Sequence, residues 1–123
     1  MKILLVEPDV LLAQTYTGAL EHAGHEVNVA GTAQTAIHAA DDTTPDLVVL
    51  EMQLVSHSGI EFLYEFRSYP DWLNIPIMLH TTAITLPNKE LLRKLGVEAV
   101  HYKPQTTLAE LCAGVARFQP SPV

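Results

Sequence analysis

Short apolar runs alternate along the chain with segments of helical period. The runs cover residues 2–6, 25–30, 46–51, 75–80 and 98–102, and three of them are continuously apolar, as in strands buried on both faces. Between the runs, apolar residues recur every three or four positions on one face of five segments. These five stripes begin at Leu12, Ala33, Phe62, Leu91 and Leu108.

Boundary signals agree with these periods. Segments 58–61 and 107–110 each pair a serine or threonine with a glutamate three residues later, the spacing of a capping box. Pro87 suits a first helical turn, and Gly24 and Gly96 follow their helices as C-terminal caps. The order is therefore a strand followed by a helix, five times over. It predicts an α/β protein with a doubly wound parallel sheet, right-handed crossovers and helices on both faces.

Length and charge limit the classes of protein. With 123 residues the chain has room for one domain, and the formal charge of −7 argues against direct nucleic-acid binding. No run is long enough for a signal peptide or a membrane span, so we expect a cytoplasmic protein that does not bind membranes. The single cysteine, Cys112, excludes an internal disulfide and reads as a packed thiol. We expect a domain over 1–118 and a tail or truncated linker over 119–123.

Polar groups follow four of the five predicted strands. Ligands of such sheets bind beyond the carboxyl ends of the strands, so these residues would share one edge. Taken singly, these residues have simple structural explanations. Asp9 can cap a helix, Thr81 and Thr82 can satisfy loop amides, and Lys103 can pair with an acid. Together they offer acids for Mg²⁺ and a hydroxyl and an ammonium group for phosphoryl oxygens. The residues are Glu7, Pro8 and Asp9, then Glu51, then Thr81 and Thr82, then Lys103 and Pro104.

Four motifs in this order resemble the receiver domain of two-component response regulators. They are "ILLVEPD", "PDLVVLEMQL" followed by "SG", "IPIMLHTTA" and "VHYKP". The resemblance implies a flavodoxin-like (CheY-like) fold of five parallel strands in the order 2-1-3-4-5 with five helices. It also implies a cis peptide bond between Lys103 and Pro104.

The sequence departs from the family at the phosphoacceptor. Glu51 stands where the family has aspartate, and the extra methylene advances the carboxylate by about 1.5 Å. Pro8 replaces the second acid, a metal ligand in the family, and Asp9 lies one position late. If Mg²⁺ binds, the resemblance assigns it to Glu7, Asp9, Glu51 and the carbonyl of Gln53. We expect no resident cofactor, with Mg²⁺ at most weakly bound.

The switch of the family is altered as well. The resemblance couples Thr81 to an aromatic residue three positions before Lys103, and this position holds Val100. Tyr102 lies two residues further, on the same face of a regular strand, and is a candidate substitute.

Two functions follow from these departures. The first is a pseudo-receiver, not an enzyme, in which a Glu51–Lys103 pair, supported by Thr81, fixes one conformation without phosphate. In it the longer acid either mimics the phosphorylated state or plugs the site, and the sequence is compatible with both. The resemblance gives it protein partners, such as a histidine kinase, an output domain or a second receiver, on the face of the fourth helix, fifth strand and fifth helix, with a homodimer as one form. The second is a working receiver that accepts a phosphoryl group on Glu51 with Mg²⁺.

A flavodoxin-like cofactor binder would need a hydroxyl- and glycine-rich phosphate loop after the first strand, which "EPDVLLAQ" lacks. None of the six histidines has metal-ligand spacing. Two of them, His57 and His80, are placed to approach the cleft, although packed or solvated histidines are the simpler interpretation.

Overall fold

The computed structural model describes residues 1–120, and residues 121–123 of the expected tail lie outside the described part. Five parallel strands form one sheet in the order β2-β1-β3-β4-β5. The strands are β1 (Lys2–Val6), β2 (Glu26–Ala30), β3 (Leu47–Leu50), β4 (Ile77–Thr81) and β5 (Val97–Tyr102). The helices are α1 (Val10–His22), α2 (Ala33–Asp42), α3 (Gly59–Arg67), α4 (Lys89–Lys94) and α5 (Leu108–Ala116), with the 3-10 turns η1 (Pro70–Trp72) and η2 (Lys103–Gln105). The predicted fold class and strand order are confirmed.

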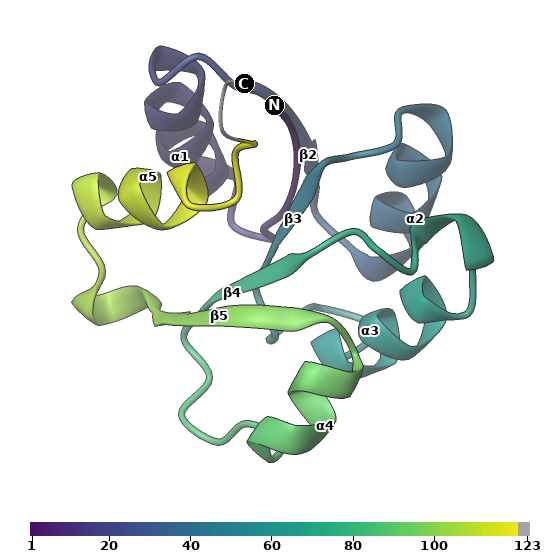
Figure 1. Cartoon of the computed structure of the whole chain (residues 1–123). Coiled ribbons are helices and arrows are strands. Elements are labelled where there is room, and N and C mark those ends of the chain that lie inside the picture. Colours follow the sequence, from purple (N-terminus) through teal and green to yellow (C-terminus); the bar gives the residue numbers. More distant parts are fainter. Residues whose placement is uncertain (121–123) are drawn as a thin grey trace.

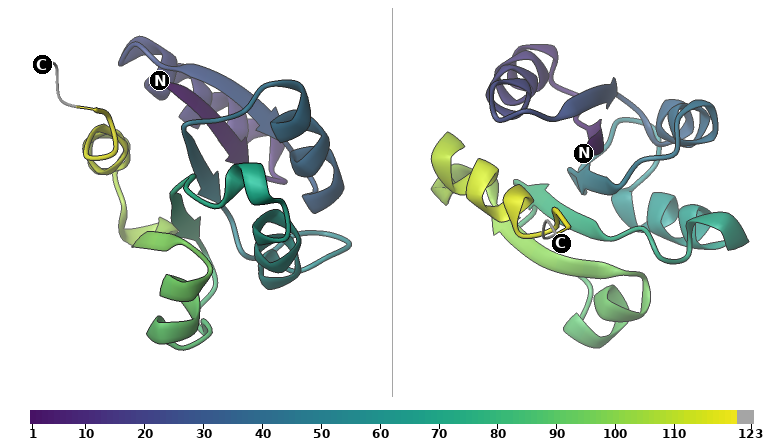
Figure 2. Two further views of the ribbon diagram at one scale, coloured as in Figure 1. Left: turned by 45° about the vertical axis from the view of Figure 1, so that its right-hand side comes forward. Right: turned by 45° about the horizontal axis from the view of Figure 1, so that its top comes forward.

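The sheet lies between two layers of helices (Figures 1 and 2). Alternate residues of β1 face opposite sides, so Ile3 and Leu5 pack with α1 and α5 while Leu4 and Val6 pack with α2, α3 and α4. Leu47–Leu50 is fully buried because both of its faces are covered, which is why it reads as a continuous apolar run.

Most of the predicted caps are present. The Thr107 capping box is complete, and Ser58 accepts a hydrogen bond from the Glu61 amide. Gly24 and Gly96 have φ of 98° and 84°, the left-handed conformation that ends a helix. Pro87 was expected in the first turn of α4, but it precedes the N-cap. Asn88 accepts from the Leu91 amide at 2.8 Å, so the helix begins only at Lys89.

The expected cis bond before Pro104 is wrong, since no peptide bond of residues 1–120 is cis. With a trans bond the chain passes directly from β5 into η2, which the Thr106 amide closes by donating to the Lys103 carbonyl at 3.2 Å.

Near the C-terminal end, Phe118 packs against the cluster that α1 and α5 share, so the fold reaches at least to this residue. The domain boundary at 118 stays a prediction. Cys112 is partly buried between α5 and α1, with Sγ 3.8 Å from the Ala19 carbonyl oxygen. No helix within residues 1–120 is long and apolar enough to cross a membrane.

Candidate functional site

The predicted site residues do meet at the carboxyl edge of the sheet. Glu7 and Glu51 each follow a strand by one residue and extend its ladder, because the Glu7 amide donates to Ala30 O and the Glu51 amide to Val6 O, both at 3.0 Å. Both glutamates are 4% exposed. Two buried carboxylates therefore stand side by side at the ends of adjacent strands.

The carboxylate of Glu51 is surrounded by hydrogen-bond donors. Oε2 accepts from the Thr81 hydroxyl and from the Gln53 amide at 3.1 Å. Oε1 accepts from the Thr82 amide at 3.1 Å and from Lys103 Nζ at 2.8 Å. Burial acts to raise the pKa of Glu51, but the bonds from Lys103, Thr81 and the two backbone amides outweigh it and lower the pKa to about 2. Glu51 is therefore ionised at neutral pH.

Lys103 bridges the two glutamates. Its Nζ lies 2.5 Å from Glu7 Oε1 and 2.8 Å from Glu51 Oε1, and its side chain is 8% exposed. Burial acts to lower the pKa of Lys103, yet the hydrogen bonds and charges of Glu51 and Glu7 leave it raised. The pair with Glu51 was expected, whereas the contact with Glu7 was not. The only signal for it was that both residues follow strands of the same sheet.

Pro8 and Asp9, which lie between Glu7 and α1, do not indicate a metal site. Asp9 is the N-cap of α1, with Oδ1 accepting from the Leu12 amide at 2.9 Å. Its own amide donates to Glu7 Oε2 at 3.1 Å. Pro8 contributes no side-chain donor atom. Asp9 therefore has the capping role that the sequence also allowed.

This donor set does not fit a resident Mg²⁺, which requires near-octahedral oxygen ligands at about 2.0 to 2.1 Å. Each carboxylate oxygen of Glu7 and Glu51 already accepts a hydrogen bond from the protein, and an ammonium group lies between them. The exposed Gln53 side chain accepts a hydrogen bond from the Thr82 hydroxyl through Oε1, at 2.9 Å. Within residues 1–120 no cluster of three histidine, cysteine, aspartate or glutamate side chains could hold a metal ion.

Thr81, at the end of β4, also contributes to a surface beside β5. It lines a hollow of about 310 Å³ together with Val100 and Tyr102. Tyr102 is the register partner of Thr81 and Val100 that of Leu79, and both β5 residues are exposed on one face, by 37% and 49%. Tyr102 thus lies on the face expected of it, and the switch roles of Thr81, Val100 and Tyr102 stay predictions.

The two histidines expected near the cleft differ. His57 is exposed and pairs with Glu61 at 2.9 Å, away from the carboxylates. His80 is 2% exposed and its ring stands edge-on to Tyr16 at 4.8 Å between centroids. Burial, then the charges of Lys103 and His101, lower the pKa of His80 to about 4. His80 is accordingly a neutral packing residue at pH 7.

Comparisons with known proteins give the family. The model of the response regulator receiver domain matches residues 3–116. The probable transcriptional regulatory protein TcrX of Mycobacterium tuberculosis is 35% identical over 79 residues, which make up 64% of this chain and 33% of the relative. The luminescence regulatory protein LuxO of Vibrio campbellii is 28% identical over 109 residues, 88% of this chain and 22% of the relative. The chain therefore spans at most about a third of these two relatives.

Solved structures agree on the fold. The chemotaxis response regulator CheY4 of Vibrio cholerae superposes with a TM-score of 0.85 at 23% identity, covering 96% of this chain and 98% of that one. A CheY-like receiver domain protein from Methanospirillum hungatei gives a TM-score of 0.84 at 22% identity, covering 94% and 90%. Receiver domains act in two-component signalling, where they interact with histidine kinases and output domains. Because the family model matches almost the whole of this chain, the chain belongs to the response regulator receiver domain family.

Proposed function

We propose that this receiver works as a protein-interaction module that is not phosphorylated at Glu51. The observation that carries the proposal is the contact set of the Glu51 carboxylate. A hydroxyl from Thr81, backbone amides of Gln53 and Thr82 and the ammonium of Lys103 all donate to it. These are the kinds of group that phosphoryl chemistry at this edge would need for its oxygens. Glu51 itself supplies the anion that they bind.

Two features work against a phosphoryl acceptor. An attacking carboxylate oxygen needs a free lone pair, whereas each oxygen of Glu51 already accepts at least two hydrogen bonds and the side chain is 4% exposed. A shift of about 1 Å in a reacting group can reduce the rate about 100-fold, and the extra methylene moves this carboxylate further than that. The poor fit of Mg²⁺ removes the charge neutralisation that the reaction also requires.

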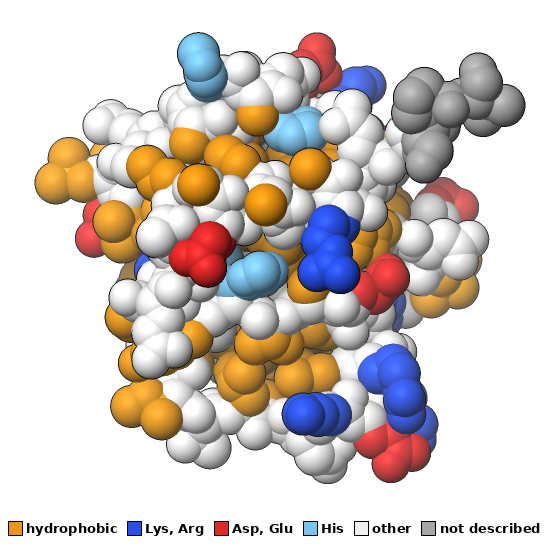
Figure 3. All heavy atoms as spheres, turned by 60° about the vertical axis from the view of Figure 1, so that its left-hand side comes forward, with side chains coloured by type: hydrophobic (Ala, Val, Ile, Leu, Met, Phe, Trp, Pro, Cys, Tyr) orange, Lys and Arg blue, Asp and Glu red, His pale blue; other side chains and the backbone are white. Residues whose placement is uncertain are grey.

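We further propose that the contact of Glu51 with Thr81 holds the domain in one signalling conformation and that partners dock on the face of α4, β5 and α5. Large apolar side chains are exposed on or beside this face, at Ile84, Val100, Tyr102 and Leu108. The space-filling view of this side shows hydrophobic patches with acidic, basic and histidine side chains between them (Figure 3). Surfaces of this mixed kind are common in protein interfaces.

The test is treatment with acetyl phosphate or beryllofluoride, with and without Mg²⁺, followed by intact mass and by NMR. The proteins compared are the wild type, Glu51→Asp and the double variant Pro8→Asp, Glu51→Asp, which restores both family acids. We expect an inert wild type and a double variant that gains phosphoryl mass and shifts its Thr81 and Lys103 resonances. A wild type that gains phosphoryl mass would overturn the proposal.

A further inference from the structure

The strand β2 is an outer strand of the sheet and pairs with β1 alone. The Glu26 amide donates to Met1 O and Ala30 O accepts from the Glu7 amide, both at 3.0 Å. Because backbone groups alternate in direction along a strand, Val27 and Val29 direct their N–H and C=O groups away from β1. Within residues 1–120 no strand lies on that side, so this edge can still form hydrogen bonds (Figure 1).

Little on β2 prevents pairing with another strand. Outer strands are normally protected by lysine, proline or a bulge. The β2 sequence EVNVA contains neither lysine nor proline, and its one charged residue, Glu26, stands at the first position. Its five residue pairs with β1 run without a shift of register. By contrast, the other outer strand, β5, pairs with a shift between Ile77 and Met78. Val29 also leaves an apolar side chain 47% exposed at the end of the open edge.

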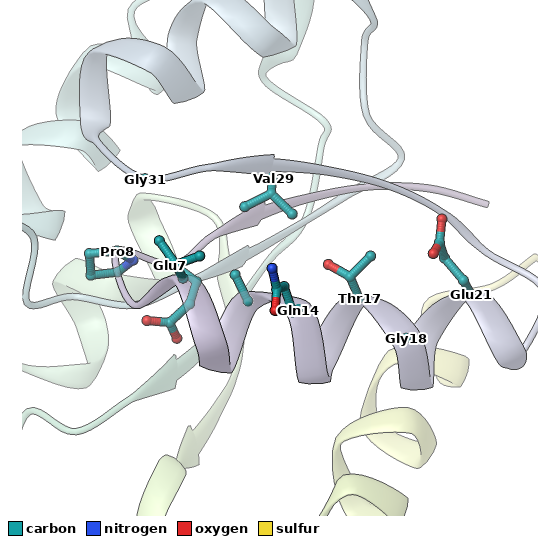
Figure 4. A pocket seen from close by; sticks show the side chains of 10 residues that line it. Glu7, Pro8, Gln14, Thr17, Gly18, Glu21, Val29 and Gly31 are labelled. Atoms are coloured by element: carbon teal, nitrogen blue, oxygen red, sulfur yellow. The ribbon is translucent and has the colours of Figure 1, made fainter.

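A groove of about 450 Å³ runs between β2 and α1 (Figure 4). Its walls include Val29 from β2 and Val10, Ala13 and Gly18 from α1. A Cβ atom added at Gly18 would meet no heavy atom within 4 Å, so this part of the groove is open. Thr17 lines the same groove, and its hydroxyl oxygen is inaccessible and has no hydrogen-bond partner in the described part of the chain. The groove is therefore mostly apolar, with one polar atom that has no partner.

A second hollow, of about 270 Å³, lies on the opposite face of β2, against α2. It is lined by Asn28 and Val29 from β2 and by Ala39, Asp42 and Thr43. Both hollows share Val29, so they flank the same stretch of backbone. A strand added at this edge would direct alternate side chains to the two sides of the sheet, one set toward each hollow.

We propose that the edge of β2 binds an extended segment of a partner protein, which adds a sixth strand to the sheet and places its side chains in these two hollows. This surface lies at the opposite edge of the sheet from β5. Its α1 groove also reaches Glu7 and Pro8, but the inference rests on the open backbone of Val27 and Val29 and does not depend on the proposed role of Glu51. Backbone hydrogen bonds to Val27 and Val29 would supply affinity, and the hollows would supply selectivity.

Charge indicates the chemistry of the segment. Exposed carboxylates stand at three points around the edge, with Glu21 beside the α1 groove, Asp42 beside the α2 hollow and Glu26 at the start of β2. The segment that fits has apolar side chains facing α1 alternating with lysine or arginine. A second copy of this chain fits poorly, because pairing β2 with β2 would bring two sets of these carboxylates together.

The probe is an acetylated and amidated peptide of about ten residues in which valine and lysine alternate, a length that exceeds one strand. Titration into the ¹⁵N-labelled protein should shift resonances of β2 and of the two hollows and protect the Val27 and Val29 amides from hydrogen exchange. The matched control is the same sequence N-methylated at two adjacent central residues, which keeps the side chains and charge but places an N-methyl group on each edge of the extended peptide, so that neither edge can pair fully with β2. We expect it to bind at least about tenfold more weakly.

A protein variant tests the same contact from the other side. Val29→Pro removes an outward N–H without removing a bond to β1, and Val29→Thr keeps this N–H as the control. We expect Val29→Pro to weaken peptide binding at least about tenfold and Val29→Thr by a smaller factor. If Val29→Pro fails to fold, the N-methylated peptide decides. The inference would be overturned if β2 resonances did not shift at about millimolar peptide, or if the N-methylated peptide bound equally well. It would also be overturned if self-association of the protein protected the β2 amides from exchange.

Discussion

Lys103 Nζ lies 2.8 Å from Glu51 Oε1 at the carboxyl edge of the sheet. The same nitrogen lies 2.5 Å from Glu7 Oε1, so one cation is shared by two carboxylates that are both nearly buried. A buried ion pair of this kind contributes little net stability over an apolar alternative, but removal of one member leaves a buried charge unpaired. The stability of the site therefore depends on the side chains of Glu7, Glu51 and Lys103 together.

Removal of the cation tests this dependence. Lys103→Met should lower the free energy of unfolding by about 3–5 kcal/mol, because Glu7 and Glu51 then face each other without compensation. Adding Glu7→Gln and Glu51→Gln to the same variant should recover most of the loss, since no charge remains buried. Urea unfolding of the single and triple variants measures both values. A loss below about 1 kcal/mol for Lys103→Met would show that water reaches these groups.

The Thr81 hydroxyl is the second support of Glu51. It donates to Oε2 and accepts from the amides of Met52 at 3.3 Å and Ala83 at 3.0 Å. Thr81→Ala should cost about 1–3 kcal/mol in unfolding free energy, whereas Thr81→Ser keeps the hydroxyl and should cost less. Because the hydroxyl favours the ionised acid, its loss should also raise the pKa of Glu51 from about 2 toward 4.5. A ¹³C NMR titration of the carboxyl group would detect this rise, and an unchanged midpoint would contradict it.

His80 should make stability depend on pH. Its pKa is lowered from 6.5 to about 4, so between these values the unfolded chain binds a proton that the folded protein does not. The contribution of His80 to the free energy of unfolding is fully present above pH 6.5. It falls as the pH drops toward 4, by about 3 kcal/mol at most. His80→Phe keeps an aromatic ring against Tyr16 and should remove this part of the slope.

The control for this measurement is His38→Gln on the exposed face of α2, which should leave the slope unchanged. Urea unfolding of the three proteins at several pH values between 7.5 and 4.5 gives the comparison. If the unfolding free energy depended on pH equally in the wild type and in His80→Phe, the pKa of His80 would be the same in the folded and unfolded states.

The hydrophobic pattern was sufficient to place all five strands and all five helices, because a fully covered parallel strand such as Leu47–Leu50 has no polar side and a helix has a period of its own. The order of the strands came from family motifs, since periodicity does not determine which strands are neighbours. The pairing of Glu51 with Lys103 could be predicted because a buried acid at the end of one strand needs a nearby cation.

Other features could not be obtained in this way. The contact between Lys103 and Glu7 depends on side-chain length and direction, and the wrong cis bond before Pro104 depended on the family pattern alone. The sequence allowed Asp9 to be either a helix cap or a metal ligand. The hydrogen bond from the Leu12 amide identifies it as the N-cap of α1. The groove beside β2 exists because Val29 is left uncovered and Gly18 lacks a side chain, a coincidence of two elements that no local motif records.

The two glycine caps form a matched pair for a last prediction. Gly24 and Gly96 both have positive φ, so alanine at either position should cost about 1–2 kcal/mol in backbone strain. An added Cβ would meet no heavy atom within 4 Å at Gly24, but at Gly96 it would overlap the guanidinium group of Arg67. Arg67 cannot easily move away, because its guanidinium donates to the carbonyls of Leu95, Trp72 and Ile75. Gly96→Ala should therefore be more destabilising than Gly24→Ala by at least about 1 kcal/mol, since it also displaces a partly buried charged group. Thermal or urea unfolding of the two variants measures the difference, and equal losses would mean that Arg67 finds other partners at no cost.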